Sequence, residues 1–209
     1  SFRPVEPDLV NASGGMEVQT KSHLPAGRWL FLIGEKTKVV NRAAKISFRK
    51  TAYVAIFCAL AVVSSGVSFP IGPTKVFPFQ HAINVVAGIM IGPWYGGLAA
   101  FLAGLLRIAI GTGTIFALPG GVPGAIIVGL FYRWLRRDWV ALTEPLGTGF
   151  IGAGLSAYLV SPFTGGEATF FFFQSAFLVS SIPGCIIGLL FVRVLRKAIS
   201  VDTWEEIGG

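Results

Sequence analysis

The chain has 209 residues, of which 53% are hydrophobic and only 13% are charged, and its mean hydropathy is +0.70. A soluble domain of this size is usually about one-quarter charged, so the composition excludes an ordinary soluble protein and indicates an integral membrane protein. The net charge of +7 does not indicate nucleic-acid binding, because Lys and Arg stand in short runs between apolar segments, as topology signals do.

Three regions follow one another along the chain. Residues 1–47 mix charge, Pro and Gly, and predict a poorly ordered cytoplasmic tail. They lack the basic region and small-residue cleavage site of a secretory signal. Residues 48–199 form the predicted membrane domain, and residues 200–209 form a short cytoplasmic C-terminal tail.

Six apolar stretches predict membrane-spanning helices, each of which needs about 20 residues. They lie at about 50–68, 76–91, 93–110, 118–136, 143–161 and 170–195. Gly92 and Pro93 separate the second stretch from the third, since Gly favours the end of a helix and Pro its first turn. The predicted fold is an all-α, six-helix transmembrane bundle.

The distribution of Lys and Arg predicts the orientation of this bundle, because basic residues concentrate on the cytoplasmic side of a membrane. With both termini inside, ten basic residues face the cytoplasm and two face outward. The ten are Arg42, Lys45, Arg49, Lys50, Arg133, Arg136, Arg137, Arg193, Arg196 and Lys197; the two are Lys75 and Arg107. We therefore expect a multi-pass protein of the cytoplasmic membrane, N-in and C-in, in contact with lipid.

Three strong hydrogen-bonding residues lie close together in the second predicted helix. Gln80 and Asn84 are four residues apart, and His81 and Asn84 are three apart, so all three share one helix face near its outer end. Polar side chains are costly in lipid and are expected to face the bundle interior or a cavity. They either bond to neighbouring helices or bind a ligand, and we favour the ligand.

The outer loops at 69–79, 107–121 and 161–171 supply further candidates for that site. Thr112 and Thr114 belong to a Gly-Thr-Gly-Thr loop, and Arg107 either joins them or extends outward to the membrane surface. Aromatic walls and a few polar groups are typical of a small-molecule pocket. The candidate walls are Phe77, Phe79, Phe116 and Phe170 to Phe173. The run Phe170 to Phe173 either packs in the core or against lipid, or places one of its four rings against a ligand.

Charged residues near these loops have simpler interpretations. Lys75 is expected to be solvated, and Glu167 to be solvated or to cap the site. Glu144 begins the fifth predicted helix on the inner side, where we expect a helix-cap role rather than a place in an outer pocket.

The sequence gives no support for an enzyme or a metal site. It contains neither a His-Glu-x-x-His motif nor a Walker lysine after Gly-Thr-Gly-Thr. Cys58 and Cys185 lie in apolar segments and are expected to be buried, unreactive thiols.

Small residues form a stripe on the first predicted helix. Ala52, Ala55 and Ala59 let a second helix backbone approach closely. They pack either within the chain or against a partner protein, and a binding protein without its own energy source needs a partner.

Several motifs, in order, resemble one family. The stretches are GPTKVFPFQHAINVVAGIMIGPWYG (72–96), AFLAGLLRIAIGTGTIFALPGGVPGA (100–125) and EPLGTGFIGA (144–153). They are similar to the ThiW type of substrate-binding S components of energy-coupling factor (ECF) transporters. The chain departs from that type at Arg107-Ile108, where Arg-Asn is common, and at Leu118-Pro119-Gly120-Gly121, where Phe-Pro-Gly-Ser is common.

The resemblance implies a function. An S component of this type captures a thiamin precursor, hydroxyethylthiazole, on the outer face. A transmembrane T component and two ATPase subunits then drive import, so ATP is a cofactor of those partners and none is expected on this chain. The open alternatives are another thiamin-related heterocycle as ligand, or a membrane interaction protein without a transport role.

Overall fold

The computed structural model describes residues 26–71, 74–165, 169–199 and 204. The chain divides into two compact units, Ser1–Arg42 and Ala43–Gly209. The first unit contributes the described helical residues 26–42, and the second holds every other described element. Residues 1–25 of the predicted N-terminal tail and most of the predicted C-terminal tail lie outside the described residues.

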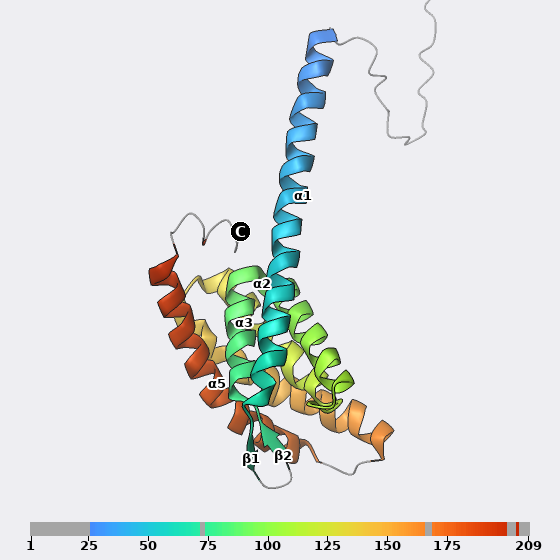
Figure 1. The fold of residues 1–209 in the computed structure, drawn as a ribbon, viewed down its shortest axis with the longest axis vertical. Helices are drawn as coiled ribbons and strands as arrows, with labels where there is room; N and C mark the ends of the chain where they lie inside the picture. The colour runs from blue at the N-terminus through green and yellow to red at the C-terminus, as the bar shows by residue number, and fades with distance from the viewer. Residues whose placement is uncertain (1–25, 72–73, 166–168, 200–203, 205–209) are drawn as a thin grey trace, which may run out of the picture. The chain divides into compact units, whose positions relative to one another are not determined.

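The second unit is a helical bundle with one small hairpin (Figure 1). Its helices are α1 (Ala26–Val63, which begins in the first unit), α2 (Pro78–Ala109), α3 (Ala117–Leu135), α4 (Glu144–Leu146) and α5 (Phe170–Ala198). Shorter helical turns are η1 (Ser64–Gly66), η2 (Asp138–Thr143), η3 (Gly147–Gly152), η4 (Leu155–Val160) and η5 (Ser161–Thr164).

Strands β1 (Phe69–Ile71) and β2 (Thr74–Val76) pair antiparallel, with Phe69 opposite Val76. This β-hairpin occupies the region that the sequence predicts as the first outer loop. It lies at the opposite end of the bundle from the C-terminal end of α5 (Figure 1).

Helix α2 consists of two arms that meet at Gly92, whose φ of 83° and ψ of 175° are not helical. Gln80 in the first arm bonds to Arg107 in the second, although a straight helix would place them about 40 Å apart. A Cβ added to Gly96 would lie 3.0 Å from the Cα of Gly88. The arms therefore run antiparallel and touch, and the predicted boundary between the second and third spans falls at the kink.

Five described segments are long and apolar enough to cross a membrane: Phe48–Gly66, Pro78–Ala109, Ala117–Leu135, Asp138–Thr164 and Phe170–Ala198. The sequence predicts six, because it divides α2 into two spans. These findings confirm a multi-span helical membrane protein.

Small residues bring the central helices close together. A Cβ on Gly129 of α3 would lie 2.6 Å from the Cα of Pro93, and a Cβ on Gly188 of α5 would lie 2.7 Å from the Cβ of Val85. Such contacts are typical of helices that pack in membranes, where close backbone approach increases van der Waals contact. Val85, Val128 and Val192 are fully buried in this core.

The segment Asp138–Thr164 differs from the regular helix predicted at 143–161. It runs through η2, α4, η3, η4 and η5, which alternate between 3₁₀, α and π geometry. Irregular helical backbone at membrane depth is tolerated where protein buries it. Thr148 and Ser156 on this segment are completely buried.

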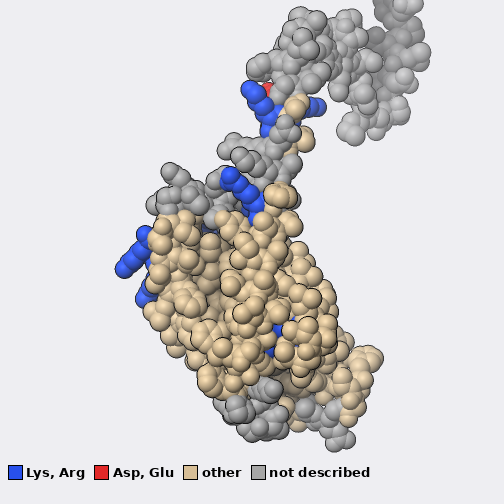
Figure 2. All heavy atoms as spheres, in the orientation of Figure 1, with Lys and Arg blue, Asp and Glu red and all other residues tan. Residues whose placement is uncertain are grey.

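The outer surface of the bundle is apolar. Most of the visible face lacks charged side chains, and Lys and Arg gather toward the end at which α5 finishes (Figure 2). Phe163, Trp134 and Val63 are 87%, 79% and 78% exposed. Many exposed large apolar side chains, on a face that shows few charged ones, indicate a membrane or protein contact.

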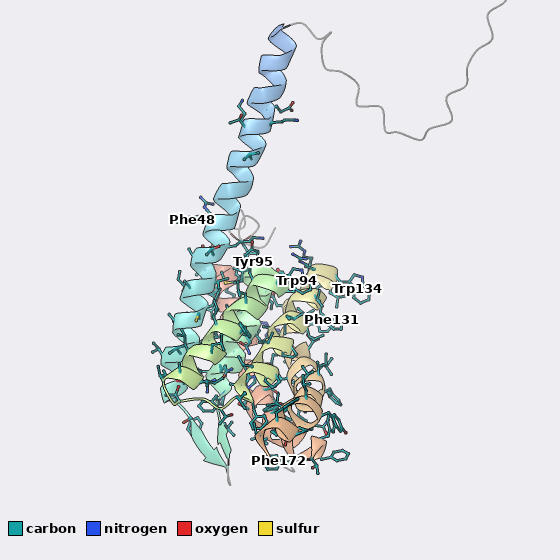
Figure 3. The ribbon with its side chains drawn as sticks, turned by 90° about the vertical axis from the view of Figure 1, so that its right-hand side faces the viewer. Phe48, Trp94, Tyr95, Phe131, Trp134 and Phe172 are labelled. Atoms are coloured by element: carbon teal, nitrogen blue, oxygen red, sulfur yellow. The ribbon has the colours of Figure 1, made fainter. Side chains whose placement is uncertain are left out.

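Aromatic side chains mark the two ends of the bundle (Figure 3). Trp94, Tyr95, Phe131 and Trp134 lie at one end and Phe172 at the other. Trp and Tyr are enriched at membrane–water boundaries, so this arrangement fits a chain embedded across a bilayer.

Candidate functional site

A cavity of about 530 Å³ opens within the second unit. It is lined by the N-terminal end of α2, the C-terminal end of α2 with the turn that follows, the start of α3, η5 and the first half of α5. The lining residues are Phe77, Gln80, His81, Arg107, Gly111, Thr112, Gly113, Thr114, Phe116, Ala117, Gly120, Gly121, Ser161, Thr164, Phe172, Phe173, Ala176, Phe177 and Ser180. Its size lies within the range of small-molecule pockets, about 300–1,000 Å³.

Six of the seven predicted binding residues line this cavity: Phe77, Gln80, His81, Arg107, Thr112 and Thr114. The two arms of α2 bring them together, since the kink at Gly92 returns Arg107 to the level of Gln80. Their role in binding remains a prediction, but the structure gathers them around one space.

Asn84, the seventh, lies behind the cavity wall. Its side chain is 2% exposed, and its amide Nδ2 donates to the carbonyl of Gly121 at 3.2 Å. A Cβ on Gly121 would lie 3.0 Å from Nε2 of Gln80 and 3.4 Å from Nδ2 of Asn84. The glycine therefore lets both amides approach α3, and Asn84 supports the wall that Gln80 faces.

Arg107 is the cation of the cavity. It is 1% exposed, so it does not extend outward to the membrane surface. Its Nη1 donates to Oε1 of Gln80, and its guanidinium lies 4.2 Å from the ring centroid of Phe77. Its Nε has no hydrogen-bond partner among the described residues, so the buried guanidinium retains donor capacity.

His81 is held by a buried carboxylate. Its Nδ1 lies 2.8 Å from Oε1 of Glu144, and that oxygen also accepts a bond of 2.7 Å from Oγ1 of Thr148. His81 is 6% exposed and Glu144 is completely buried. A buried charged group is costly unless paired and hydrogen-bonded. These two bonds satisfy Oε1, whereas Oε2 has no hydrogen-bond partner among the described residues.

The expected helix-cap role of Glu144 is therefore wrong. Glu144 lies in the first turn of α4, but its side chain bonds to His81 and Thr148. The sequence could not show this, because the contact with His81 joins segments 63 residues apart. The available signal was that Glu144 is the only acidic residue in the predicted span 143–161.

Aromatic rings form one side of the cavity. Phe116 and Phe173 have centroids 4.7 Å apart, and Phe177 lies 6.0 Å from Phe173. Phe172 also lines the cavity. Such tilted arrangements are favourable for aromatic pairs, and together the rings offer faces on which a flat ligand can stack.

The cavity walls differ in part from the aromatic residues that the sequence predicts. Phe79, Phe170 and Phe171 are not among the lining residues, whereas Phe177 and Ser180, which the sequence analysis did not select, are. The Ser180 hydroxyl accepts a bond of 2.9 Å from the Phe77 amide, which ties the start of α2 to α5. Glu167 and the side chain of Lys75 lie outside the described residues.

The predicted partner stripe is uncovered within the described structure. Ala52, Ala55 and Ala59 are all exposed on α1, so they do not pack within the second unit. Cys58, on the other face of the same helix, is buried and free, as is Cys185. Among the described residues, no group of three or more His, Cys, Asp or Glu could hold a metal ion.

These features define a class: a multi-span helical membrane protein with a partly polar, aromatic-lined cavity of small-molecule size. The model of the thiamine-precursor transporter protein (ThiW) family matches residues 51–198. The chain belongs to this family. No curated protein matches the chain significantly.

Proposed function

We propose that the protein is the substrate-binding S component of an ECF transporter, and that it captures hydroxyethylthiazole on the outer face of the cytoplasmic membrane. Membership of the thiamine-precursor transporter family supports the transport role. The protein performs no enzymatic step in this account, and partner ATPases hydrolyse the ATP that drives import.

The observation that carries the proposal is the chemistry of the cavity. Five Phe residues line a space that is also lined by Gln80, His81, Arg107 and three Thr residues. A substituted thiazole offers a flat ring that stacks on Phe, a ring nitrogen that accepts a hydrogen bond, and a hydroxyl that donates one. The cavity presents a partner for each of these features.

The proposed topology has six spans with both termini in the cytoplasm. The antiparallel arms of α2 support counting that helix as two spans, and the imbalance of Lys and Arg supports the orientation. Cysteines at the exposed positions Arg137 and Thr164 should react with a membrane-impermeant maleimide from opposite sides of sealed vesicles. Labelling of both from the same side would contradict this topology.

The proposed partners are a T component and two ATPase subunits. The uncovered stripe of Ala52, Ala55 and Ala59 supports a helix-to-helix contact with the T component, since small residues allow close approach. Because the stripe and the cavity involve different residues, a ligand can remain bound while the partner docks.

Mass spectrometry of small molecules retained by the purified protein tests the proposed ligand. We expect hydroxyethylthiazole after growth in its presence. Retention of a different thiamin-related heterocycle would reassign the substrate. If a saturating mixture of such heterocycles leaves no retained molecule, the binding role is contradicted.

A further inference from the structure

His81 and Glu144 form a polar contact inside the bundle that the proposed function does not yet use. The two side chains meet at 2.8 Å between Nδ1 and Oε1, in surroundings that leave them 6% and 0% exposed. His81 also lines the cavity, whereas Glu144 does not. Glu144 therefore contacts a lining residue without lining the cavity itself.

The contact determines which imidazole nitrogen carries a proton. An ionised carboxylate only accepts hydrogen bonds, and Oε1 already accepts from Thr148. His81 must therefore donate from Nδ1. In a neutral imidazole the other nitrogen, Nε2, is then an acceptor, and no described residue bonds to it.

Arg107 bonds to Gln80, the residue next to His81, and its Nε has no acceptor among the described residues. The cavity lining therefore already contains a strong donor, and an acceptor at Nε2 of His81 would complement it.

We propose that Glu144 is a positioning residue that fixes His81 as a hydrogen-bond acceptor toward the cavity, so that the ligand must present an O–H or N–H donor there. This inference rests on the proposed function and assigns the acceptor for the donor group of its ligand. Arg107 and Gln80 also line the cavity and supply donors, and His81 supplies the acceptor. The matching ligand is a heteroaromatic alcohol rather than its ether.

Nitrogen-15 NMR of histidine-labelled protein tests the protonation state directly. The chain contains only two histidines, His23 and His81, so a His23→Gln background leaves one pair of ring signals. We expect a protonated Nδ1 and an unprotonated Nε2. A protonated Nε2, in either the other tautomer or the imidazolium, would overturn the proposal.

Variants separate positioning from a structural role. In Glu144→Leu the ring is released, and we expect the ring signals of His81 to shift toward a mixture of tautomers. In Thr148→Val, which keeps the carboxylate, we expect the wild-type tautomer. An unchanged tautomer in Glu144→Leu would contradict the role of Glu144. If that variant does not fold, the wild-type spectrum alone tests the predicted tautomer of His81.

Ligand discrimination provides the second measurement. Wild-type protein should bind hydroxyethylthiazole at least about tenfold more tightly than its O-methyl ether, because sites that hydrogen-bond a hydroxyl reject analogues that lack it. In Glu144→Leu the ratio should fall below about threefold, since His81 can then also donate. A merely structural role would weaken both ligands in parallel and leave the ratio unchanged.

The outcomes distinguish the two proposals. Equal affinity of wild-type protein for the alcohol and the ether would overturn the inference while leaving the proposed function in place. Failure of both to bind would contradict the proposed function, and the NMR spectrum would then decide the protonation state of His81 on its own.

Discussion

Two glycines of the Asp138–Thr164 segment differ only in the space around them. Both have helical dihedrals, with φ of −67° at Gly147 and −61° at Gly154. A Cβ on Gly147 would lie 2.5 Å from the Pro123 carbonyl oxygen and 2.7 Å from the Gly124 Cα, whereas nothing lies within 4 Å of one on Gly154. Gly147 is therefore required by packing, and Gly154 is not.

This pair gives a matched prediction. Gly147→Ala should lower the free energy of unfolding by about 1–3 kcal/mol, because the backbone of α3 cannot yield to the added methyl group. Gly154→Ala should be neutral or stabilising by about 0.5–1 kcal/mol, since Ala favours a helix. Thermal unfolding in detergent measures both, and equal midpoints would contradict the close contact between α3 and η3.

At the residue scale, the sequence predicted the polar residues that line the cavity better than the residues that hold them in place. Gln80, His81 and Arg107 could be selected because polar groups in apolar helices are conspicuous. The roles of Glu144 and Asn84 depend on contacts with His81 and Gly121, across 63 and 37 residues. No local pattern encodes which buried polar groups meet across such separations.

The kink of α2 is the element on which the site depends. Gly92 has φ of 83° and ψ of 175°, a region that is essentially restricted to glycine. Gly92→Ala should therefore destabilise the fold by about 1–3 kcal/mol and displace Arg107 from Gln80. A Cβ there would lie 3.6 Å from the nearest atom, on Arg133, so the effect would be conformational rather than steric.

Thermal unfolding and ligand binding by Gly92→Ala check this prediction, with Gly154→Ala as the control. Wild-type stability together with wild-type affinity in Gly92→Ala would show that the kink does not hold the cavity together.

The exposed face of α1 carries the prediction about partners. Ala55→Trp and Ala59→Trp should each abolish co-purification with the proposed T component, because a large side chain prevents close helix approach. Ile186→Trp on α5, where Ile186 is also half exposed, is the matched control and should retain the complex. An intact complex with both alanine variants would place the partner elsewhere.

At the element scale, the sequence predicted helix positions but not backbone detail. The Gly92-Pro93 signal located the turn within α2, because both residues restrict the backbone locally. The mixed 3₁₀ and π geometry of Asp138–Thr164 and the β-hairpin at 69–76 were not predicted. The mixed helical geometry of Asp138–Thr164 depends on packing against α3 and α5, which a hydrophobicity pattern does not predict.

For the whole molecule, the class of protein and its family could be predicted from properties that extend along the entire chain. Apolar composition and the order of motifs indicated a ThiW-like membrane protein, and the family match confirms it. The cavity could be predicted only in outline. Its shape depends on how Phe77, Thr112 and Phe173 meet from three distant segments.

Isothermal titration of hydroxyethylthiazole into the purified protein tests the central claim most directly. We expect saturable binding at one site, weakened at least about tenfold by Gln80→Ala, which leaves the buried Arg107 without its acceptor. Gln174→Ala on α5, a residue that does not line the cavity, should bind like the wild type. No saturable binding by the wild type, or undiminished affinity in Gln80→Ala, would contradict the account.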